Sequence, residues 1–421
     1  MKLLPLLLSL TIILASCGGT VPVQETAPQT TAATSAAAEE AAAIPETAAA
    51  EITPEAYKLK AYDESLPALK DTFADYFDTG TAINTGDLKP DSEYLKTVLK
   101  HYGVFTTENE MKPESINPAD GVYNFSAADK FVAFGIENNV KLRGHTLVWH
   151  SQVPGWWFGG SGEGGAATSD ELLSRMREYI SSVMGRYKGK IYSWDVVNEC
   201  ISDSGAGLRR DAENSKWASI VGDLDGDGNY SDYIEQAFIA AREADPDALL
   251  ILNDYSLEQD ENKLNSFYDL AESMLKKGIP LDGVGIQAHI QIGWPSVQNF
   301  EKSIEKLAEL KQYNPDLKIL ITELDVSIFD WQDQSLTKEM TPEFEEQLAY
   351  RWSDLFEMFR RQAEKGNLDT VITWGFYDKM SWLNDYPVVG RTNEPLLFDR
   401  EMNTKPAFWG VVDRNNIQNI T

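Results

Sequence analysis

After Pro54 the sequence alternates between short apolar runs and longer stretches of helical periodicity, and this alternation restricts the chain to a small set of α/β folds. Eight runs rich in Val, Ile and Leu fit buried β-strands, and they cover residues 81–84, 103–107, 141–146, 190–197, 248–253, 283–288, 317–322 and 370–375. Amphipathic stretches that predict helices lie at residues 91–102, 127–138, 170–187, 232–243, 263–277, 296–312 and 343–364, with a weaker one at 405–412.

Strands that alternate with helices predict a parallel sheet, and eight is the number that closes into a (β/α)8 TIM barrel with side chains filling its middle. An open doubly wound sheet is the alternative. No Gly-rich phosphate fingerprint follows the first run, and the sequence contains no Gly-x-x-x-x-Gly-Lys-Ser/Thr motif, so the nucleotide-binding forms of that alternative lack support. We therefore expect one catalytic (β/α)8 domain over residues 54–421.

The first 53 residues have a different character. An apolar run at residues 3–13 is too short to span a bilayer and fits the core of a signal peptide. Leu14-Ala15-Ser16-Cys17 resembles a bacterial lipobox, in which Cys17 is acylated; plain cleavage nearby is the alternative. Residues 18–53 are almost wholly Ala, Thr, Pro, Glu, Ser and Gly and predict a disordered linker. We predict an exported protein held on the bacterial cell surface by the lipid at Cys17, or otherwise secreted.

Charge narrows the classes of partner. The chain has 37 basic and 66 acidic residues and a formal net charge of −29. Such a chain repels a phosphate backbone and an anionic membrane alike, so we expect no nucleic acid and no membrane contact beyond the lipid anchor. Eleven Trp and 17 Tyr suit stacking on sugar rings, although ordinary core packing accounts for most of them. Two cysteines cannot form a disulfide framework.

Polar side chains follow seven of the eight predicted strands, at the end of a parallel barrel where chemistry is found. The segments are Glu108 to Lys112, His145 to Gln152, Asn198-Glu199, Asn253 to Tyr255, Gln287 to His289, Glu323 to Asp325 and Trp374. One polar residue in such a place is usually a loop start or a helix cap. Agreement among seven strands indicates a functional site.

Glu199 and Glu323 each close an apolar run, on the fourth and seventh predicted strands. Glycoside hydrolysis needs two carboxyl groups that flank the anomeric carbon, one to protonate the leaving oxygen and one to attack or to activate water. Closing the barrel brings these two strand ends together. An ion pair between each Glu and a loop cation is the alternative that these residues alone leave open.

Trp194-Asp195-Val196-Val197-Asn198-Glu199 and Ile321-Thr322-Glu323-Leu324-Asp325 resemble the two signature segments of glycoside hydrolase family 10. Further matching motifs stand in the same order: Thr107 to Lys112, Gly144 to Gln152, Gly285 to His289, and Trp374 with Trp382. The resemblance covers residues 55–413, and most members of that family are endo-β-1,4-xylanases. It implies a (β/α)8 fold, hydrolysis of xylan with retention of configuration, and no metal or cofactor.

The resemblance also implies a role for each matching residue. Glu199 is the expected general acid/base and Glu323 the expected nucleophile, which His289 contacts while Asp325 holds that His. Asn198 is expected to hydrogen-bond the 2-hydroxyl of the sugar. The other expected substrate-binding residues are Glu108, Asn109, Lys112, His145, Trp149, Gln152, Tyr255, Gln287, Trp374 and Trp382. Tyr255 and Gln287 match less distinctively, and a packing role for Tyr255 stays open.

Three features add to this pattern. Residues 159–165 form a Gly-rich insertion that we interpret as a surface loop rather than a lid. Residues 223–228 resemble the first half of an EF-hand loop, but the twelfth position is Ile234 instead of a bidentate Glu, so we favour a solvated acidic loop over a calcium site. Cys200 is expected to be a small buried packing residue rather than a nucleophile.

The sequence thus predicts a monomeric endo-β-1,4-xylanase that acts on xylan or xylo-oligosaccharides. A surface lipoprotein that binds glycans without turnover is one alternative, although the two carboxylates argue against it. A related β-1,4-glucanase or cellobiohydrolase is another, because the groove for xylose differs little from one for glucose except where a hydroxymethyl group must fit.

Overall fold

The fold is a (β/α)8 barrel, seen in a computed structural model that describes residues 57–161 and 165–420. The predicted signal peptide with Cys17, the predicted linker and part of the Gly-rich insertion lie outside the described residues. The barrel strands are β1 (Asp78–Ile83), β2 (Val104–Thr107), β3 (Lys141–Val148), β4 (Ser193–Asn198), β5 (Leu249–Asp254), β6 (Gly283–Ile286), β8 (Lys318–Ser327) and β9 (Thr370–Thr373).

All neighbouring strands pair in parallel, in the order β6-β5-β4-β3-β2-β1-β9-β8, and pairing of β6 with β8 closes the ring. The predicted eight-strand barrel is therefore confirmed, and the open sheet is excluded. Each strand is buried on both faces, since side chains fill the barrel and helices cover it, so the strands are apolar runs rather than alternating patterns. Gly144 shows how tight the interior is: a Cβ built on it would lie 2.0 Å from the ring of Trp194.

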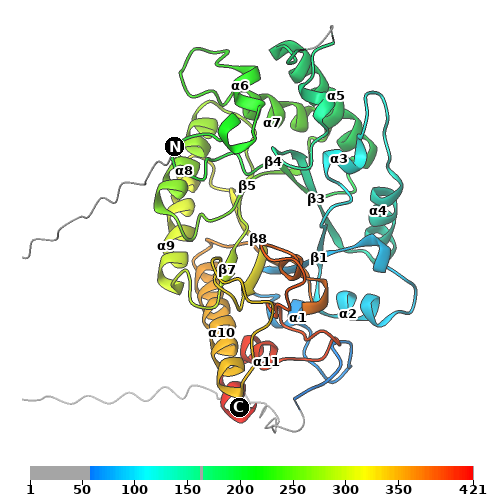
Figure 1. Cartoon of the computed structure of the whole chain (residues 1–421), viewed down its shortest axis with the longest axis vertical. Helices are drawn as coiled ribbons and strands as arrows, with labels where there is room; N and C mark the ends of the chain where they lie inside the picture. Colours follow the sequence, from blue (N-terminus) through cyan, green and yellow to red (C-terminus); the bar gives the residue numbers. More distant parts are fainter. Residues whose placement is uncertain (1–56, 162–164, 421) are drawn as a thin grey trace, which may run out of the picture. The chain divides into compact units, whose positions relative to one another are not determined.

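The long helices form the outer layer around the strands (Figure 1). They are α2 (Glu93–His101), α4 (Ser126–Asn138), α5 (Ser169–Tyr187), α7 (Asp232–Ala244), α8 (Glu261–Lys276), α9 (Val297–Ala308), α10 (Pro342–Glu364) and α11 (Pro406–Val412). Local sequence sets several of their starts. Thr168 and Glu171 form a capping box at α5, and Thr341 caps α10 ahead of Pro342 at the first position.

The predicted helices agree with these bounds within about two residues, except that α9 ends at Ala308 and a 3-10 turn continues to Gln312. Several short elements were not predicted. They are α1 (Leu69–Thr72), α3 (Pro113–Ile116), α6 (Trp217–Val221), α12 (Ile417–Ile420) and the strand β7 (His289–Gln291), which pairs only with the end of β8. Elements of three to five residues carry too little periodicity to be recognised in a sequence.

Two site-bearing strands run further than predicted. β3 continues past the predicted end at Thr146 to Val148, and β8 continues past the predicted end at Thr322 to Ser327. The pairing of β3 with β4 is irregular between His145 and Val148, and that of β8 with β9 is irregular between Ile321 and Leu324. Such irregularities change the direction of the side chains beside them, so these residues face the same end of the barrel although the strand has not ended.

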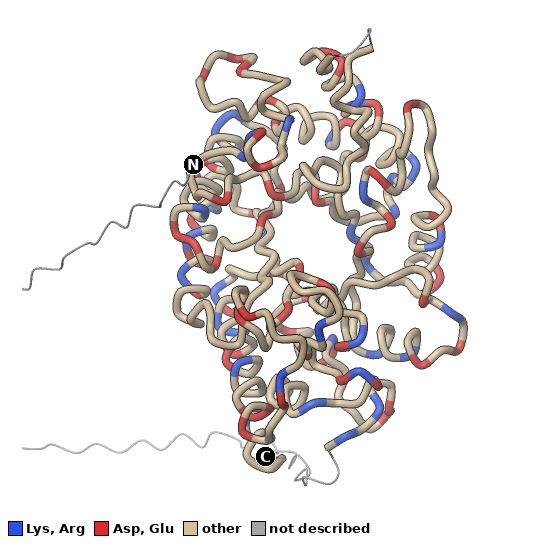
Figure 2. Tube along the Cα trace, in the orientation of Figure 1, with Lys and Arg blue, Asp and Glu red and all other residues tan. Residues whose placement is uncertain are grey.

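Acidic and basic side chains are interspersed along the chain trace rather than collected on separate faces (Figure 2). Many of them form ion pairs between neighbouring elements, such as Arg186 with Asp129 and Lys365 with Glu305. Among the described residues, no helix is both long enough and apolar enough to cross a membrane.

Candidate active site

A cavity of about 670 Å³ opens where the barrel strands lead into their loops. Its lining contains both predicted catalytic carboxylates, Glu199 and Glu323. The other lining residues that the sequence pointed to are Glu108, Asn109, Lys112, His145, Trp149, Asn198, Gln152, Tyr255, Gln287, His289, Trp374 and Trp382. Asp325 does not line the cavity and lies behind His289. One cavity thus collects residues that are spread over more than 270 positions of the chain.

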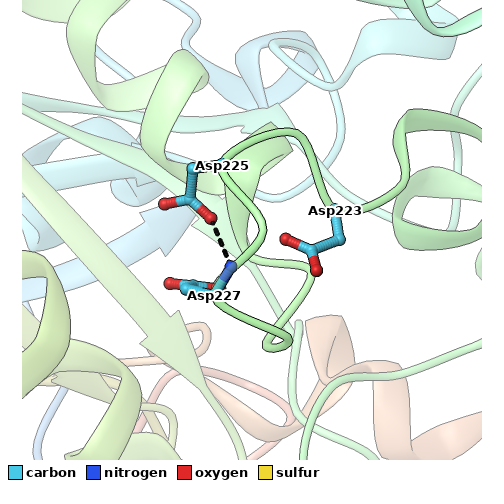
Figure 3. A group of neighbouring side chains, drawn as sticks. All are labelled: Asp223, Asp225 and Asp227. Carbon is cyan, nitrogen blue, oxygen red and sulfur yellow. Dashed lines mark hydrogen bonds between the residues drawn. The ribbon is translucent and has the colours of Figure 1, made fainter.

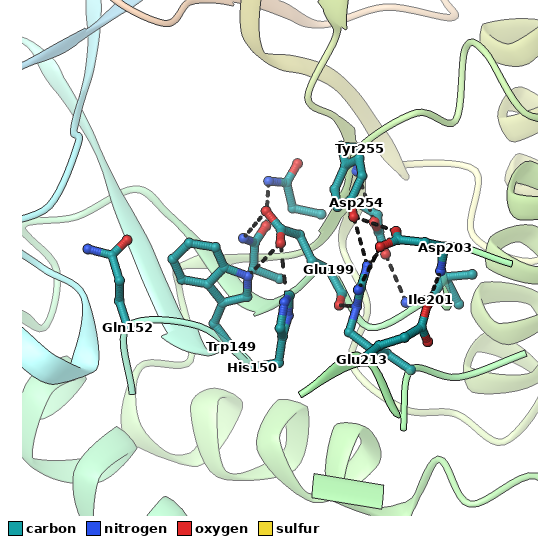
Figure 4. Close-up of polar contacts among 12 residues, drawn as sticks. Trp149, His150, Gln152, Glu199, Ile201, Asp203, Glu213, Asp254 and Tyr255 are labelled. Atoms are coloured by element: carbon teal, nitrogen blue, oxygen red, sulfur yellow. Dashed lines mark hydrogen bonds and ion pairs between the residues drawn. The ribbon is translucent and has the colours of Figure 1, made fainter. Parts of the chain in front are cut away.

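Glu199 follows the last residue of β4 and has an unusual backbone φ of 55°. Its Oε2 accepts a hydrogen bond from Trp149 Nε1 at 2.8 Å, and its Oε1 accepts from Gln287 Nε2 at 3.0 Å. The Nδ1 atom of His150 lies 3.9 Å from Oε2 (Figure 4). Burial lowers the pKa of His150 to about 4, so this His is neutral near pH 7. Asn198 Nδ2 also donates to Glu199 Oε1 at 3.2 Å, so the contacts that hold this carboxyl group come from uncharged side chains.

Glu323 has the opposite surroundings. Its side chain is buried, its Oε1 accepts a hydrogen bond from Asn253 Nδ2 at 2.9 Å, and its Oε2 lies 3.3 Å from His289 Nε2. Burial by itself would raise the pKa of Glu323. The hydrogen bond from His289 and the charges of His145 and His289 outweigh burial, and the pKa lies below its ordinary value. Glu323 is therefore ionised when a sugar arrives.

His289 owes its charge to Asp325. Its Nδ1 lies 2.9 Å from Asp325 Oδ2, and the same oxygen accepts a hydrogen bond from Trp382 Nε1 at 2.8 Å. Burial opposes a charged imidazole, but Asp325 and Glu323 together raise the pKa of His289 to about 10. Trp382, Asp325, His289 and Glu323 therefore form one chain of contacts that fixes the orientation of the buried carboxylate.

Two amides connect the carboxylates across the cavity floor. Asn253 Nδ2 donates to Glu323 Oε1 and to Asn198 Oδ1, both at 2.9 Å. Gln287 Nε2 donates to Asn198 Oδ1 at 3.2 Å as well as to Glu199. Asn253 was noted in the sequence only as the end of a strand, with no role assigned. A lone Asn at a strand end gives no sign of which acceptors its amide will reach.

One wall of the cavity is polar. Lys112 Nζ donates to Asn109 Oδ1 at 3.0 Å and to Gln152 Oε1 at 2.7 Å, and it lies 4.9 Å from the centre of the Trp149 ring. Burial, followed by the charge of Glu110, raises the pKa of Glu108 to about 7. The Oε1 atom of Glu108 is buried and has no hydrogen-bond partner among the described residues. This wall presents groups that can bind sugar hydroxyls.

His145 is positioned from inside the barrel. Its Nδ1 lies 2.9 Å from Asp195 Oδ2, and the other oxygen of Asp195 accepts from Arg143. All three side chains are almost completely buried. The ring of His145 packs edge-on against Trp374, which gives the cavity an aromatic border together with Trp382.

Some lining residues were not predicted as site residues. His150 and Ser151 lie within the predicted motif Gly144 to Gln152 but had no assigned role, and Ser256 follows Tyr255. Trp331 and Tyr386 lie on the loops after β8 and β9, and both are exposed. An exposed aromatic residue on a loop indicates a binding site only when the strands before it are already placed. The sequence alone therefore did not identify Trp331 and Tyr386.

Tyr255 lines the cavity and is also held by charged neighbours, so its position agrees with either of the roles that the sequence left open. Lys263 Nζ lies 3.4 Å from the centre of its ring, and its hydroxyl accepts from Arg209 Nη2 at 2.9 Å and donates to Asp203. Cys200 is buried and unpaired, and burial raises the pKa of its thiol well above the ordinary value. Such a thiol does not act as a nucleophile, as expected.

The EF-hand-like loop gathers three carboxylates. Oxygens of Asp223, Asp225 and Asp227 lie within 4.8 Å of one another (Figure 3). Lys277 Nζ contacts Asp225 at 2.8 Å and Asp227 at 2.6 Å, and it also contacts Glu235 at 2.8 Å. The ammonium group of Lys277 therefore balances part of the negative charge of this loop.

The chain matches the model of glycosyl hydrolase family 10 over residues 68–414. Endo-1,4-beta-xylanase C of Paenibacillus barcinonensis is 41% identical over 358 residues, which cover 85% of this chain and 32% of that protein, so the chain spans about a third of that relative. Endo-1,4-beta-xylanase B of the same organism is 40% identical over 352 residues, covering 83% of this chain and 99% of that protein. A solved structure of GH10 from Paenibacillus barcinonensis has 42% sequence identity and a TM-score of 0.80, and the match covers 84% of this chain and 99% of that chain. With a family match over most of its length, this chain belongs to glycosyl hydrolase family 10.

Proposed function

We propose that the chain is a retaining endo-β-1,4-xylanase, with Glu199 as general acid/base and Glu323 as nucleophile. The observation that carries this proposal is the pairing of unlike carboxyl environments in one cavity. Glu323 faces a charged His289, whereas Glu199 is held by the neutral donors Trp149 and Gln287. Double displacement requires two carboxyl groups with different tasks, and unlike surroundings are what two such tasks need.

In the first step the Glu323 carboxylate attacks the anomeric carbon. The glycosidic C–O bond breaks as Glu199 gives its proton to the leaving oxygen, and a covalent glycosyl ester forms. In the second step water attacks the same carbon, Glu199 takes the proton from that water, and Glu323 leaves as a carboxylate. This sequence needs a separation of about 5 to 5.5 Å between the two carboxyl groups, because no water stands between them in the first step.

The other residues are assigned to the sugar. We assign Asn198, whose Oδ1 accepts from Asn253 and Gln287, to the 2-hydroxyl, a contact that strengthens as positive charge develops on the ring. We assign Glu108, Asn109, Lys112, His145, Trp149 and Gln152 to the glycone side of the cut, and Trp374 and Trp382 to the aromatic border of the same groove. We also assign Tyr255 to substrate binding, because it lines the same cavity.

The test uses unbranched xylan and the Glu323→Ala variant. We expect wild type to release a range of oligosaccharides at early times, as an endo-acting enzyme does, and nuclear magnetic resonance to detect the β-anomer first. Glu323→Ala should lose turnover, while Glu305→Ala, a change at an exposed glutamate of α9, should keep it. Binding of xylan without turnover would favour the glycan-binding alternative, and faster hydrolysis of cellulose would favour the glucanase alternative.

We also propose that the full-length protein is exported as a lipoprotein through Cys17, on the basis of the lipobox-like segment at residues 14–17. We further propose that it is monomeric. Labelling with radioactive palmitate in a bacterial host should mark the wild-type chain and not Cys17→Ser. Equal labelling of both, or a mature N-terminus elsewhere than residue 17, would contradict the lipid anchor. Light scattering of the purified protein measures the oligomeric state.

A further inference from the structure

The main chain at Glu199 is held in a conformation that its residue type disfavours. The φ angle of 55° lies in the left-handed region, where a glutamate is strained. A strained residue keeps such a conformation only when its surroundings fix it. Here the amide N–H donates to the carbonyl of Asn253 at 2.8 Å, and the carbonyl oxygen accepts from Arg209 Nε at 3.2 Å. Both polar groups of the residue are thus fixed by other segments.

Arg209 is almost completely buried, and all three nitrogen atoms of its guanidinium group donate hydrogen bonds. Its Nη1 and Nη2 donate to the two carboxylate oxygens of Asp203 at 2.9 and 2.7 Å, a bidentate pair. Nη2 also donates to the Tyr255 hydroxyl at 2.9 Å. One planar group therefore connects the backbone of Glu199 with Tyr255, which lines the cavity.

The surrounding charges are paired. Lys263 Nζ lies 3.0 Å from the buried Asp254 and 3.3 Å from Asp203, and it covers the face of Tyr255. Asp254 accepts in turn from the amide of Ile201 at 3.0 Å, two residues after Glu199. Figure 4 shows Asp203, Asp254 and Tyr255 on one side of Glu199, with Trp149 and His150 on the other. The acid/base is thus held on one side by a network of which the proposed mechanism uses only Tyr255.

We propose that Arg209, oriented by Asp203, is a positioning residue that holds the acid/base and Tyr255 as one unit. This inference rests on the proposed function. A lysine in place of Arg209 keeps the charge near Asp203 but cannot donate to three acceptors in one plane. The Glu199 peptide and the Tyr255 ring then move independently, and the proton of Glu199 is no longer presented to the leaving oxygen.

The effect depends on the leaving group, because a good leaving group departs without a proton. A displacement of about 1 Å in a reacting group costs about 100-fold in rate. For Arg209→Lys we therefore expect kcat/KM for phenyl xylobioside, which needs the proton, to fall about 100-fold. The kcat/KM for 2,4-dinitrophenyl xylobioside should fall less than about fivefold, since its first step depends on Glu323 alone. Azide, which attacks without a general base, should increase kcat of the variant on the dinitrophenyl substrate and yield the glycosyl azide.

A matched control is Arg242→Lys. Arg242 likewise donates to main-chain carbonyls, those of Pro246 and Ala248 at 2.7 and 2.8 Å, and pairs with an aspartate, but it lies outside the cavity. This variant should keep the wild-type ratio of the two kcat/KM values and show no azide effect, whatever happens to its melting temperature. Asp203→Asn, whose side chain is half exposed, provides a milder second variant with the same expected direction.

Equal losses on both substrates would overturn the inference, because they would mean that Arg209 only stabilises the fold. An unchanged ratio in soluble, folded Asp203→Asn and Arg209→Lys would overturn it too. If the wild-type chain hydrolysed neither xylobioside, the proposed function itself would fail, and this result is distinct because it does not depend on any variant.

Discussion

The contact between His289 and Glu323 makes a quantitative prediction for the pH dependence of catalysis. Unit charges 3.3 Å apart attract by about 5 kcal/mol at an effective dielectric constant of about 20, and this is an upper bound because burial opposes both charges. A cation beside a carboxylate lowers the carboxyl pKa by about 1 to 3 units. Replacing His289 by Asn removes that cation, and burial then raises the pKa of Glu323.

We therefore expect the acid limb of the kcat/KM profile to move up by about 1 to 3 pH units in His289→Asn. The charges of His145 and Lys112 also act on Glu323 and remain in the variant, so they limit the shift. The assay is kcat/KM for dinitrophenyl xylobioside from pH 3 to 9, because its first step does not need the proton of Glu199 and reports the nucleophile.

The matched control is His101→Asn. His101 is also buried, but burial lowers its pKa to about 4 and it lies against Ala61, outside the cavity. Removing it should change stability and leave the acid limb in place. An unmoved acid limb in His289→Asn, or an equal shift in His101→Asn, would refute the assignment of the low pKa of Glu323 to its charged neighbour.

The same pair predicts a pH-dependent stability. The pKa of His289 is raised in the folded protein, from an ordinary value of 6.5 to about 10, so the folded state binds the proton more tightly. This contribution is fully present below pH 6.5 and is lost as pH rises toward 10. The difference in unfolding free energy between wild type and His289→Asn should therefore shrink across that window in urea titrations. A difference that grows with pH would contradict this reasoning.

Two further predictions concern the polar wall and the barrel interior. Because the pKa of Glu108 is raised to about 7, its carboxyl group is a hydrogen-bond donor in acid. KM for xylohexaose should therefore rise between pH 6 and 8 in wild type but not in Glu108→Gln, which keeps a donor at every pH. Parallel KM curves for the two proteins would contradict this. Gly144→Ala should lower the free energy of unfolding by about 1 to 3 kcal/mol and unfold at a lower urea concentration, because its Cβ would overlap the Trp194 ring. Gly103→Ala, with no atom within 4 Å of the added methyl, should change the unfolding midpoint little. Equal midpoints for the two variants would contradict the packing argument.

The sequence predicted the barrel well because buried parallel strands are continuous apolar runs, and each run needs only its own residues to be recognised. It was less accurate where neighbouring strands decide the outcome. The run at residues 283–288 is one strand in sequence, but the chain turns at Ala288 with a φ of 65° and resumes as β7 at His289. Alanine rarely adopts that conformation, so nothing local predicts the turn.

The family motifs placed Glu199 and Glu323, and the resemblance also predicted the contacts of His289 and Asp325 behind Glu323. They assigned no role to Asn253 or Arg209. Asn253 contacts Glu323, which lies 70 positions away in the sequence, and Arg209 contacts the backbone of Glu199, which lies 10 positions away. A hydrogen bond depends on geometry within a few tenths of an ångström, and no sequence pattern of two residues carries that information. The reactive groups and the pair of His289 and Asp325 could therefore be found from sequence, whereas Asn253 and Arg209 could not.

Part of the backbone strain in this protein lies at the cavity. Nine non-glycine residues with positive φ occur among the described residues, and two of them, Asn139 and Asn214, are at helix ends, where Asn tolerates that conformation. Gln152, Glu199 and Ser256 line the cavity, and Ala288 directly precedes His289. These four follow four successive barrel strands, β3 to β6, so the chain turns sharply at the same level of the barrel each time. A core closed by eight strands can bear that cost, because its packing does not depend on the loops. These strained turns direct side chains from rigid strand ends into one cavity. The carboxylates therefore do not need to be ordered when a sugar binds.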